Sequence, residues 1–159
     1  YTTLFRSNKI KFIAPFVSLI HGVDSLKLLK VIDAEAKKCK RKINCLLQFH
    51  IAAEETKFGF TQEEAFEMLE SSEFMKLENI SVCGVMGMAT FTDDMNHVRN
   101  EFRNLKAIFD SFRIKYFQNN PEFCEISMGM SDDYTIAVEE GSTIVRIGSK
   151  IFGERIYQH

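Results

Sequence analysis

Apolar residues follow two alternating patterns along this chain: short unbroken runs, and longer segments with helical spacing. The clearest helix is predicted over 95–116, because an apolar side chain recurs there every three or four residues. A second helical segment follows Asp24 and Ser25, which suit a helix N-terminus, and residues 61–64 form a capping box that predicts a third. A fourth helix is predicted between 131 and 141, where a glycine ends it.

Five short apolar runs separate these segments and predict strands at 17–23, 43–51, 82–88, 123–128 and 143–148. Strands that alternate with helices, without hairpin signals, predict a parallel sheet with helical crossovers. Two architectures fit this order. One is a small doubly wound sheet, and the other is part of a (β/α) barrel, since five strands cannot close a barrel of eight.

The composition is that of an ordinary globular domain. A chain of 159 residues can bury on the order of 70% of its unfolded surface in one core. The 20 basic and 22 acidic residues are well mixed and give a net charge of -2, which argues against nucleic-acid or membrane partners. No apolar run approaches the ~20 residues that span a bilayer, and no signal-peptide pattern is seen, so we expect a cytoplasmic protein.

The four cysteines, at positions 39, 45, 83 and 124, contain no CxxC pair and have no histidine at metal-ligand spacing. We therefore expect no metal site. Mostly buried free thiols in a reducing cytoplasm are the simplest interpretation.

Candidate chemistry concentrates near the C-terminus, in segments 127–133 and 141–149. Both lie at the carboxyl ends of predicted strands, where parallel α/β folds bind ligands. Hydroxyls, small residues and backbone N–H groups near a helix start suit a phosphate. The pattern favours Ser127, Gly148 and Ser149 as phosphate ligands, with a short helix that begins at the last two.

Two neighbouring residues have open interpretations. Ser131 is more simply a helix cap than a ligand. Arg146 lies on a predicted buried strand, where an unpaired charge is costly. It must therefore meet either a carboxylate of the protein or a ligand, and the residues alone leave both alternatives open.

The C-terminal segments 127–133, 137–148 and 151–155 resemble the pyridoxal phosphate homeostasis proteins, single-domain relatives of the alanine racemase barrel. The similarity continues upstream in residues 7–9 (S-N-K, against L-Q-[ST]-N-K in the family), 19–25 (L-I-H-G-V-D-S, against I-H-S-V-D-S), 54–59 (E-E-T-K-F-G, against E-x-x-K-x-G) and 83–88 (C-G-V-M-G-M, against G-L-M). It runs from Asn8 to the C-terminus without a large gap.

This resemblance implies a (β/α)8 TIM barrel of the alanine racemase N-terminal type, present here as an incomplete barrel of about strands 4 to 8. It also implies that the lysine that forms a Schiff base with pyridoxal 5'-phosphate lies upstream, on the first strand. Residues 1–7, YTTLFRS, start as a strand-like run and match the translation of a DNA sequencing adapter. We expect them to be non-native and 8–159 to be the C-terminal portion of a single cofactor-binding barrel domain.

The resemblance also implies roles for individual residues. Ser127, Gly148 and Ser149 would hold the cofactor phosphate, with Ser149 where the family usually has threonine. Arg146 would face the pyridine nitrogen, and Asn8 would lie near the ring from the end of the third strand. Of the strand methionines Met86, Met88, Met128 and Met130, which more simply pack in the sheet, Met128 is retained as a cofactor-binding candidate.

The implied function is non-catalytic: the whole protein binds pyridoxal phosphate and buffers and delivers it, with pyridoxal-phosphate-dependent apoenzymes as partners. The alternative is a racemase-like enzyme, which would need a second acid–base residue from a β-rich domain after the barrel, and the chain ends at His159. A doubly wound domain with a generic phosphate ligand is a third option. We predict no catalytic residue: His21 and His50 are more simply structural, and the loop residue Lys57 is more simply solvated than bound to the cofactor.

Overall fold

The computed structural model describes residues 2–52 and 58–153, and for residues 2–7 it describes the backbone alone. Its single sheet contains β1 (Leu19–Val23), β2 (Ile43–Phe49), β3 (Ile80–Gly87), β4 (Glu125–Met130) and β5 (Ile144–Arg146). Every neighbouring pair is parallel, and the order in the sheet is the order in the chain. A doubly wound sheet would reverse its order at a switch point, so the sequential order is that of a barrel.

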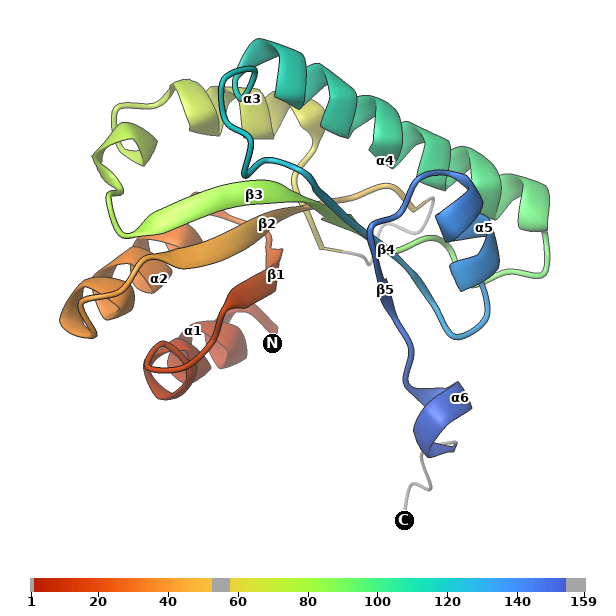
Figure 1. Ribbon diagram of the computed structural model, residues 1–159, viewed down its shortest axis with the longest axis horizontal. Helices are drawn as coiled ribbons and strands as arrows, with labels where there is room; N and C mark the ends of the chain where they lie inside the picture. Colours follow the sequence, from red (N-terminus) through yellow and green to blue (C-terminus); the bar gives the residue numbers. More distant parts are fainter. Residues whose placement is uncertain (1, 53–57, 154–159) are drawn as a thin grey trace.

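The sheet is strongly curved. The Nδ1 atom of His21 on β1 lies 2.9 Å from the Oγ atom of Ser127 on β4, although β2 and β3 separate these strands. In a flat sheet the two strands would be roughly 14 Å apart, because neighbouring strands are ~4.8 Å apart. The five strands therefore form a parallel half-barrel, visible as an arch in Figure 1.

Helices cover the convex side of this arch (Figure 1). The helices are α1 (Thr2–Ile13), α2 (Leu26–Lys38), α3 (Gln62–Glu70), α4 (Met95–Lys115) and α5 (Tyr134–Glu139), with a short 3-10 helix η1 (Phe74–Lys76). A further short helix, α6 (Ser149–Phe152), lies beyond the end of β5 and does not cover the sheet (Figure 1). The main hydrophobic core lies between the helices and the sheet. Phe112 of α4 is central to it, since its ring stacks on Phe66 at 4.7 Å and meets Phe49 edge-on at 5.3 Å.

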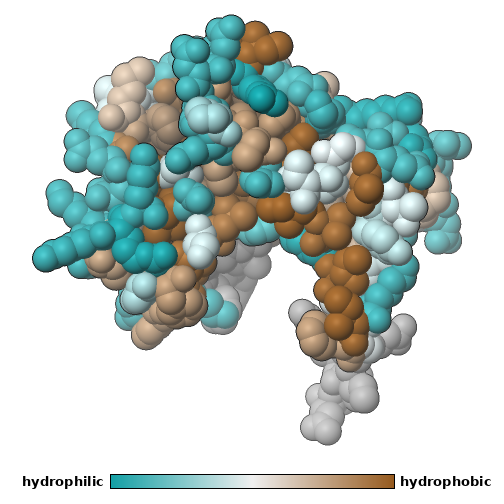
Figure 2. Space-filling view, viewed as in Figure 1, coloured by the Kyte–Doolittle hydropathy of each residue, from teal (hydrophilic) through white to brown (hydrophobic). Residues whose placement is uncertain are grey.

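A second, smaller cluster of buried side chains lies on the concave side, which we call the inner face. Leu46, Cys83 and Met86 form it, and Leu19 and Met88 pack against them. Figure 2 shows the concave side as a hollow between the two ends of the arch. Ile151 and Phe152 are exposed on α6, beyond this hollow.

The predicted helix starts at 25 and 61 are confirmed. The Ser25 hydroxyl accepts a hydrogen bond from the backbone N–H of Leu28 at 3.3 Å. Thr61 and Glu64 form both bonds of the capping box, at 2.9 and 3.1 Å. These signals are local, because a cap needs only the residues of one helical turn.

The strand-like interpretation of the N-terminal segment, with Asn8 at the end of a strand, is wrong. Residues 2–13 form helix α1, so Asn8 is an exposed helical residue and does not end a strand. A helix satisfies its backbone N–H and C=O groups within the segment, whereas a strand needs a neighbouring strand. Helix α1 packs beside α2, and the Arg41 side chain donates a hydrogen bond to the carbonyl oxygen of Ala14 at 2.7 Å.

None of the helices in the described part of the chain has both the length and the apolar character to cross a membrane.

Gly84 sets the closest approach between two strands. A Cβ atom at this position would lie 1.9 Å from the carbonyl oxygen of Glu125 on β4. The neighbouring Gly87 is less demanding, since its added Cβ would lie 2.7 Å from a terminal methyl of Ile51, which is the end of a side chain. The glycine at 84 is therefore required for the pairing of β3 with β4.

We expect Gly84→Ala to lower the free energy of unfolding by about 2–3 kcal/mol, because overpacking against backbone cannot be relieved by a rotamer change. Gly87→Ala is the matched control, with an expected cost of about 1 kcal/mol or less. Urea titration of both variants measures the difference. Equal losses would contradict the assigned contact.

The thiols of Cys45 and Cys83 should be unreactive in the folded protein. Burial raises the pKa of Cys45 to about 12 and that of Cys83 to about 11, and the thiolate is the reactive form. We expect a disulfide reagent at pH 8 to modify exposed Cys124 and half-buried Cys39, and all four thiols only in denaturant. Rapid native modification of Cys83 would show that the inner face is not packed as described.

Candidate functional site

Arg146, the last residue of β5, is the most constrained charged group at the carboxyl edge of the sheet. One terminal nitrogen donates to the Oγ and carbonyl oxygen of Ser127 at 2.7 and 3.0 Å, and the other donates to the carbonyl oxygen of Gly87 at 3.1 Å. Burial lowers the pKa of the guanidinium, and nearby Asp133 opposes that change. Among the described residues, Arg146 has no carboxylate ion-pair partner, so a ligand remains the open alternative.

Ser127 is fully buried, and its hydroxyl lies between Arg146 and His21. Its described contacts are therefore with protein groups. The direct phosphate contact expected for Ser127 stays a prediction, while its observed role is to hold the guanidinium.

Met128 does not face the site. Side chains alternate along a strand, and Met128 is 0% exposed in the convex-side core, beside Ala137, whereas Ser127 faces the inner side. The Met128 side chain therefore points away from Arg146, and the cofactor contact expected for Met128 stays a prediction. The other strand methionines lie in two places. Met86 packs on the inner face, whereas Met88 and the exposed Met130 line a pocket.

Ser131 is not the helix cap that its sequence context favours. Helix α5 begins three residues later, and the Ser131 hydroxyl instead accepts a hydrogen bond from the backbone N–H of Gly148 at 3.3 Å. It thereby joins the loop after β4 to the start of α6. The signal for this role was its position directly after a strand, at the same edge as Gly148.

Gly148 and Ser149 lie at the predicted short helix, α6, and both are exposed. Apart from its chain neighbours, no described atom lies within 4 Å of a Cβ added at Gly148. The hydroxyls of Ser131 and Ser149 and the backbone N–H of Ser149 lie beside this open side of Gly148, and such groups bind phosphates. We call these three residues the phosphate cradle.

His21 is half-buried at the other side of Ser127. Burial and the charge of Arg146 lower the pKa of its imidazole, and Glu125 acts in the opposite direction. The described contacts connect neither Asn8 nor His50 to Arg146, and Lys57 lies outside the described residues. The described residues contain no group of His, Cys, Asp or Glu side chains arranged to hold a metal ion.

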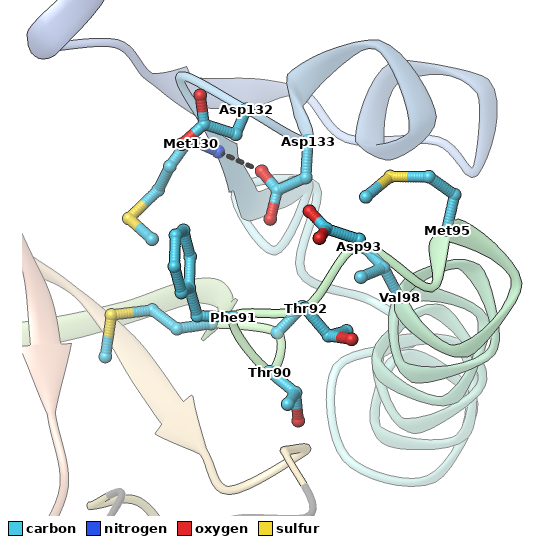
Figure 3. A pocket seen from close by; sticks show the side chains of 11 residues that line it. Thr90, Phe91, Thr92, Asp93, Met95, Val98, Met130, Asp132 and Asp133 are labelled. Atoms are coloured by element: carbon cyan, nitrogen blue, oxygen red, sulfur yellow. Dashed lines mark hydrogen bonds between the residues drawn. The ribbon is translucent and has the colours of Figure 1, made fainter.

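A cavity of about 650 Å³ lies beside the site, between the loops that follow β3 and β4 (Figure 3). Its wall includes Asp93, Asp132 and Asp133, and Figure 3 shows the side chains of Asp93 and Asp133 directed toward one another. The Oδ1 atom of Asp133 accepts a hydrogen bond from the Met130 backbone N–H at 2.5 Å. This acidic wall disfavours an anion in the cavity, so an anionic group is better placed at the phosphate cradle.

A buried carboxylate holds the loop after β3 that borders this cavity. Glu101 of α4 is 7% exposed, and it accepts hydrogen bonds from the backbone N–H and the hydroxyl of Thr90, both at 2.7 Å. His97 lies 3.0 Å from the same carboxylate. The loop is therefore tied to α4, although its Phe91 side chain is 87% exposed.

Comparisons with solved structures agree with the half-barrel. PipY of Synechococcus elongatus, solved with pyridoxal phosphate bound, superposes with a TM-score of 0.78 at 26% identity, over 92% of this chain and 66% of that one. An alanine racemase of Clostridium difficile, in complex with cycloserine, gives 0.70 at 19% identity, over 98% of this chain and 40% of that one. The second likeness shows the fold alone.

Curated relatives extend the match to most of the sequence. The pyridoxal phosphate homeostasis protein of Aquifex aeolicus is 36% identical over 152 residues, which are 96% of this chain and 64% of the relative. The protein of that name from Synechocystis is 30% identical over 95% of this chain and 67% of its own. This chain thus spans about two thirds of the length of such relatives.

The family described as alanine racemase, N-terminal domain, matches residues 3–156. The chain therefore belongs to this family, and within it to the pyridoxal phosphate homeostasis proteins.

Proposed function

We propose that this chain is part of a pyridoxal phosphate binding protein that buffers and delivers the cofactor in the cytoplasm and does not itself catalyse a reaction. The observation that carries the proposal is Arg146: a half-buried cation, without a carboxylate partner among the described residues, next to the phosphate cradle. The names of the curated relatives and the pyridoxal phosphate bound to PipY support the same cofactor.

The residues of the site fit this cofactor. The hydroxyls of Ser131 and Ser149 and the backbone N–H of Ser149, beside Gly148, would hold its phosphate, and Arg146 would face its pyridine nitrogen. A guanidinium carries five N–H donors, and three hydrogen bonds from Arg146 to protein groups are described. Donors therefore remain for a ligand.

The choice of arginine bears on reactivity. Bound pyridoxal phosphate supplies an aldehyde carbon and a ring that can accept electrons. Arg146 can only donate a hydrogen bond, so it leaves the ring nitrogen unprotonated and weakens the ring as an electron acceptor. This disfavours transamination and decarboxylation. The racemase alternative has less support, since the alanine racemase likeness concerns the fold, whereas the relatives from Aquifex aeolicus and Synechocystis are named homeostasis proteins.

We also propose that β1 to β5 correspond to strands 4 to 8 of an eight-stranded barrel in the whole protein. Sequential parallel order supports this numbering. An apolar cavity of about 370 Å³ beside edge strand β1 supports it too, with Ile13, Ile20 and Met86 in its wall. The lysine that binds the cofactor covalently would then lie outside these 159 residues, and apoenzymes that need the cofactor would be the partners.

The phosphate cradle predicts which ligand binds. Isothermal titration of this chain should show weak, reversible binding of pyridoxal phosphate and little binding of pyridoxal, which lacks the phosphate. Ser131→Ala should weaken pyridoxal phosphate binding about tenfold, because a hydrogen bond to a charged group is lost. Ser18→Ala, at an exposed loop serine, is the matched control and should bind as the parent does.

Two results would count against the cradle. Equal affinity for pyridoxal phosphate and pyridoxal would show that the phosphate is not recognised. Equal affinity of the Ser131→Ala and Ser18→Ala variants would place the phosphate elsewhere.

Covalent attachment is not expected in this chain. Incubation with pyridoxal phosphate, borohydride reduction and peptide mapping should leave all lysines unmodified at stoichiometric ligand, because exposed lysines are solvated. A stable adduct at Lys57 would contradict this prediction and would assign the covalent role to that residue.

A further inference from the structure

The buried Ser127 hydroxyl connects two strands that are not neighbours. Its Oγ atom lies 2.7 Å from a terminal nitrogen of Arg146 on β5 and 2.9 Å from Nδ1 of His21 on β1. Arg146 also reaches across β4 to the carbonyl oxygen of Gly87 on β3. The guanidinium orientation thus depends on a serine that is itself held from the opposite end of the half-barrel.

The chemistry of these groups determines which one donates the hydrogen in each contact. A guanidinium only donates, so the Ser127 oxygen accepts from Arg146. The hydroxyl has one hydrogen to donate, and His21 Nδ1 is the acceptor in reach. The imidazole is then neutral, with its proton on Nε2.

The charges around His21 favour the same state. The groups that face it are Arg146 from β5 and Glu125 from β4, and burial and Arg146 together outweigh the carboxylate, so the pKa of the imidazole lies below its usual value. A neutral imidazole beside a guanidinium avoids placing two cations on either side of one serine.

We propose that His21 is a positioning residue of the cofactor site: through the hydroxyl of Ser127, it fixes the Arg146 guanidinium with its remaining N–H groups toward the ligand. This inference rests on the proposed function, since it assigns the held arginine to the pyridoxal phosphate site. His21 itself contacts neither the ligand nor a reacting atom.

Protonation reverses the contact. A doubly protonated imidazole has no acceptor at Nδ1, so it cannot take the Ser127 hydrogen. Because the folded-state pKa of His21 is lowered, the folded protein binds this proton less readily than the unfolded chain does. The contribution of neutral His21 to the stability of the fold is complete above its unfolded-state pKa of about 6.5, and it is lost as the pH falls through the folded-state pKa.

The first measurement needs no ligand. Nitrogen-15 spectra of the uniformly labelled chain at pH 7.5 distinguish the two neutral imidazole tautomers, and His21→Asn identifies the His21 signals. We expect the proton on Nε2, and in Ser127→Ala a loss of the single-tautomer signature. A proton on Nδ1 in the parent chain would overturn the proposal.

The second measurement is calorimetric titration with pyridoxal phosphate between pH 5 and 8. His21→Leu should weaken binding about fivefold to tenfold at pH 7.5, because it removes the acceptor for Ser127. His21→Asn, which places an amide oxygen near the former Nδ1 position, should restore most of the affinity at pH 7.5. His50→Asn is the control and should keep the parent's affinity and pH profile.

The outcomes separate the two proposals. If His21→Asn binds as poorly as His21→Leu at pH 7.5, His21 has only a packing role and the inference is wrong. If neither parent nor variants bind pyridoxal phosphate at any pH, the proposed function fails and the positioning role fails with it, while the tautomer measurement still reports whether the contact exists.

Discussion

The site depends on one constraint: each strand pairs in parallel with the strand that precedes it in the chain. Parallel pairing brings every carboxyl end to the same edge, and sequential order with the natural twist of strands curls the sheet. Curvature then brings His21, Ser127 and Arg146 together on the inner face, although they come from β1, β4 and β5. The phosphate cradle forms at the same edge, from the loop after β4 and the start of α6.

The carboxyl edge of the sheet has an acidic region and a region of hydrogen-bond donors. The cavity between the loops after β3 and β4 carries three aspartates, while the cradle presents hydroxyls and N–H groups. Arg146 lies near Asp133 but bonds to a hydroxyl and two carbonyl oxygens. A ligand with an anionic end and a ring acceptor is thus oriented by long-range repulsion as well as by short hydrogen bonds.

Features that depend on neighbouring residues could be predicted from the sequence. The spacing of apolar residues defined α4, and the caps at Ser25 and Thr61 needed one turn of helix each. Features set by tertiary geometry could not be predicted in this way. The alternation along β4 separates Met128 from Ser127 without saying which face is the inner one, and the role of Ser131 depends on where β5 lies. Asn8 was misplaced because the choice between helix and strand there depends on the available hydrogen-bond partners.

Strand β5 has a consequence for any ligand that Arg146 holds. It contains three residues, and its last one is tied by its side chain to β3 and β4. A ligand that binds Arg146 only while β5 is docked would stabilise the docked strand by mass action. A change that loosens β5 would, by the same linkage, lower the affinity for that ligand.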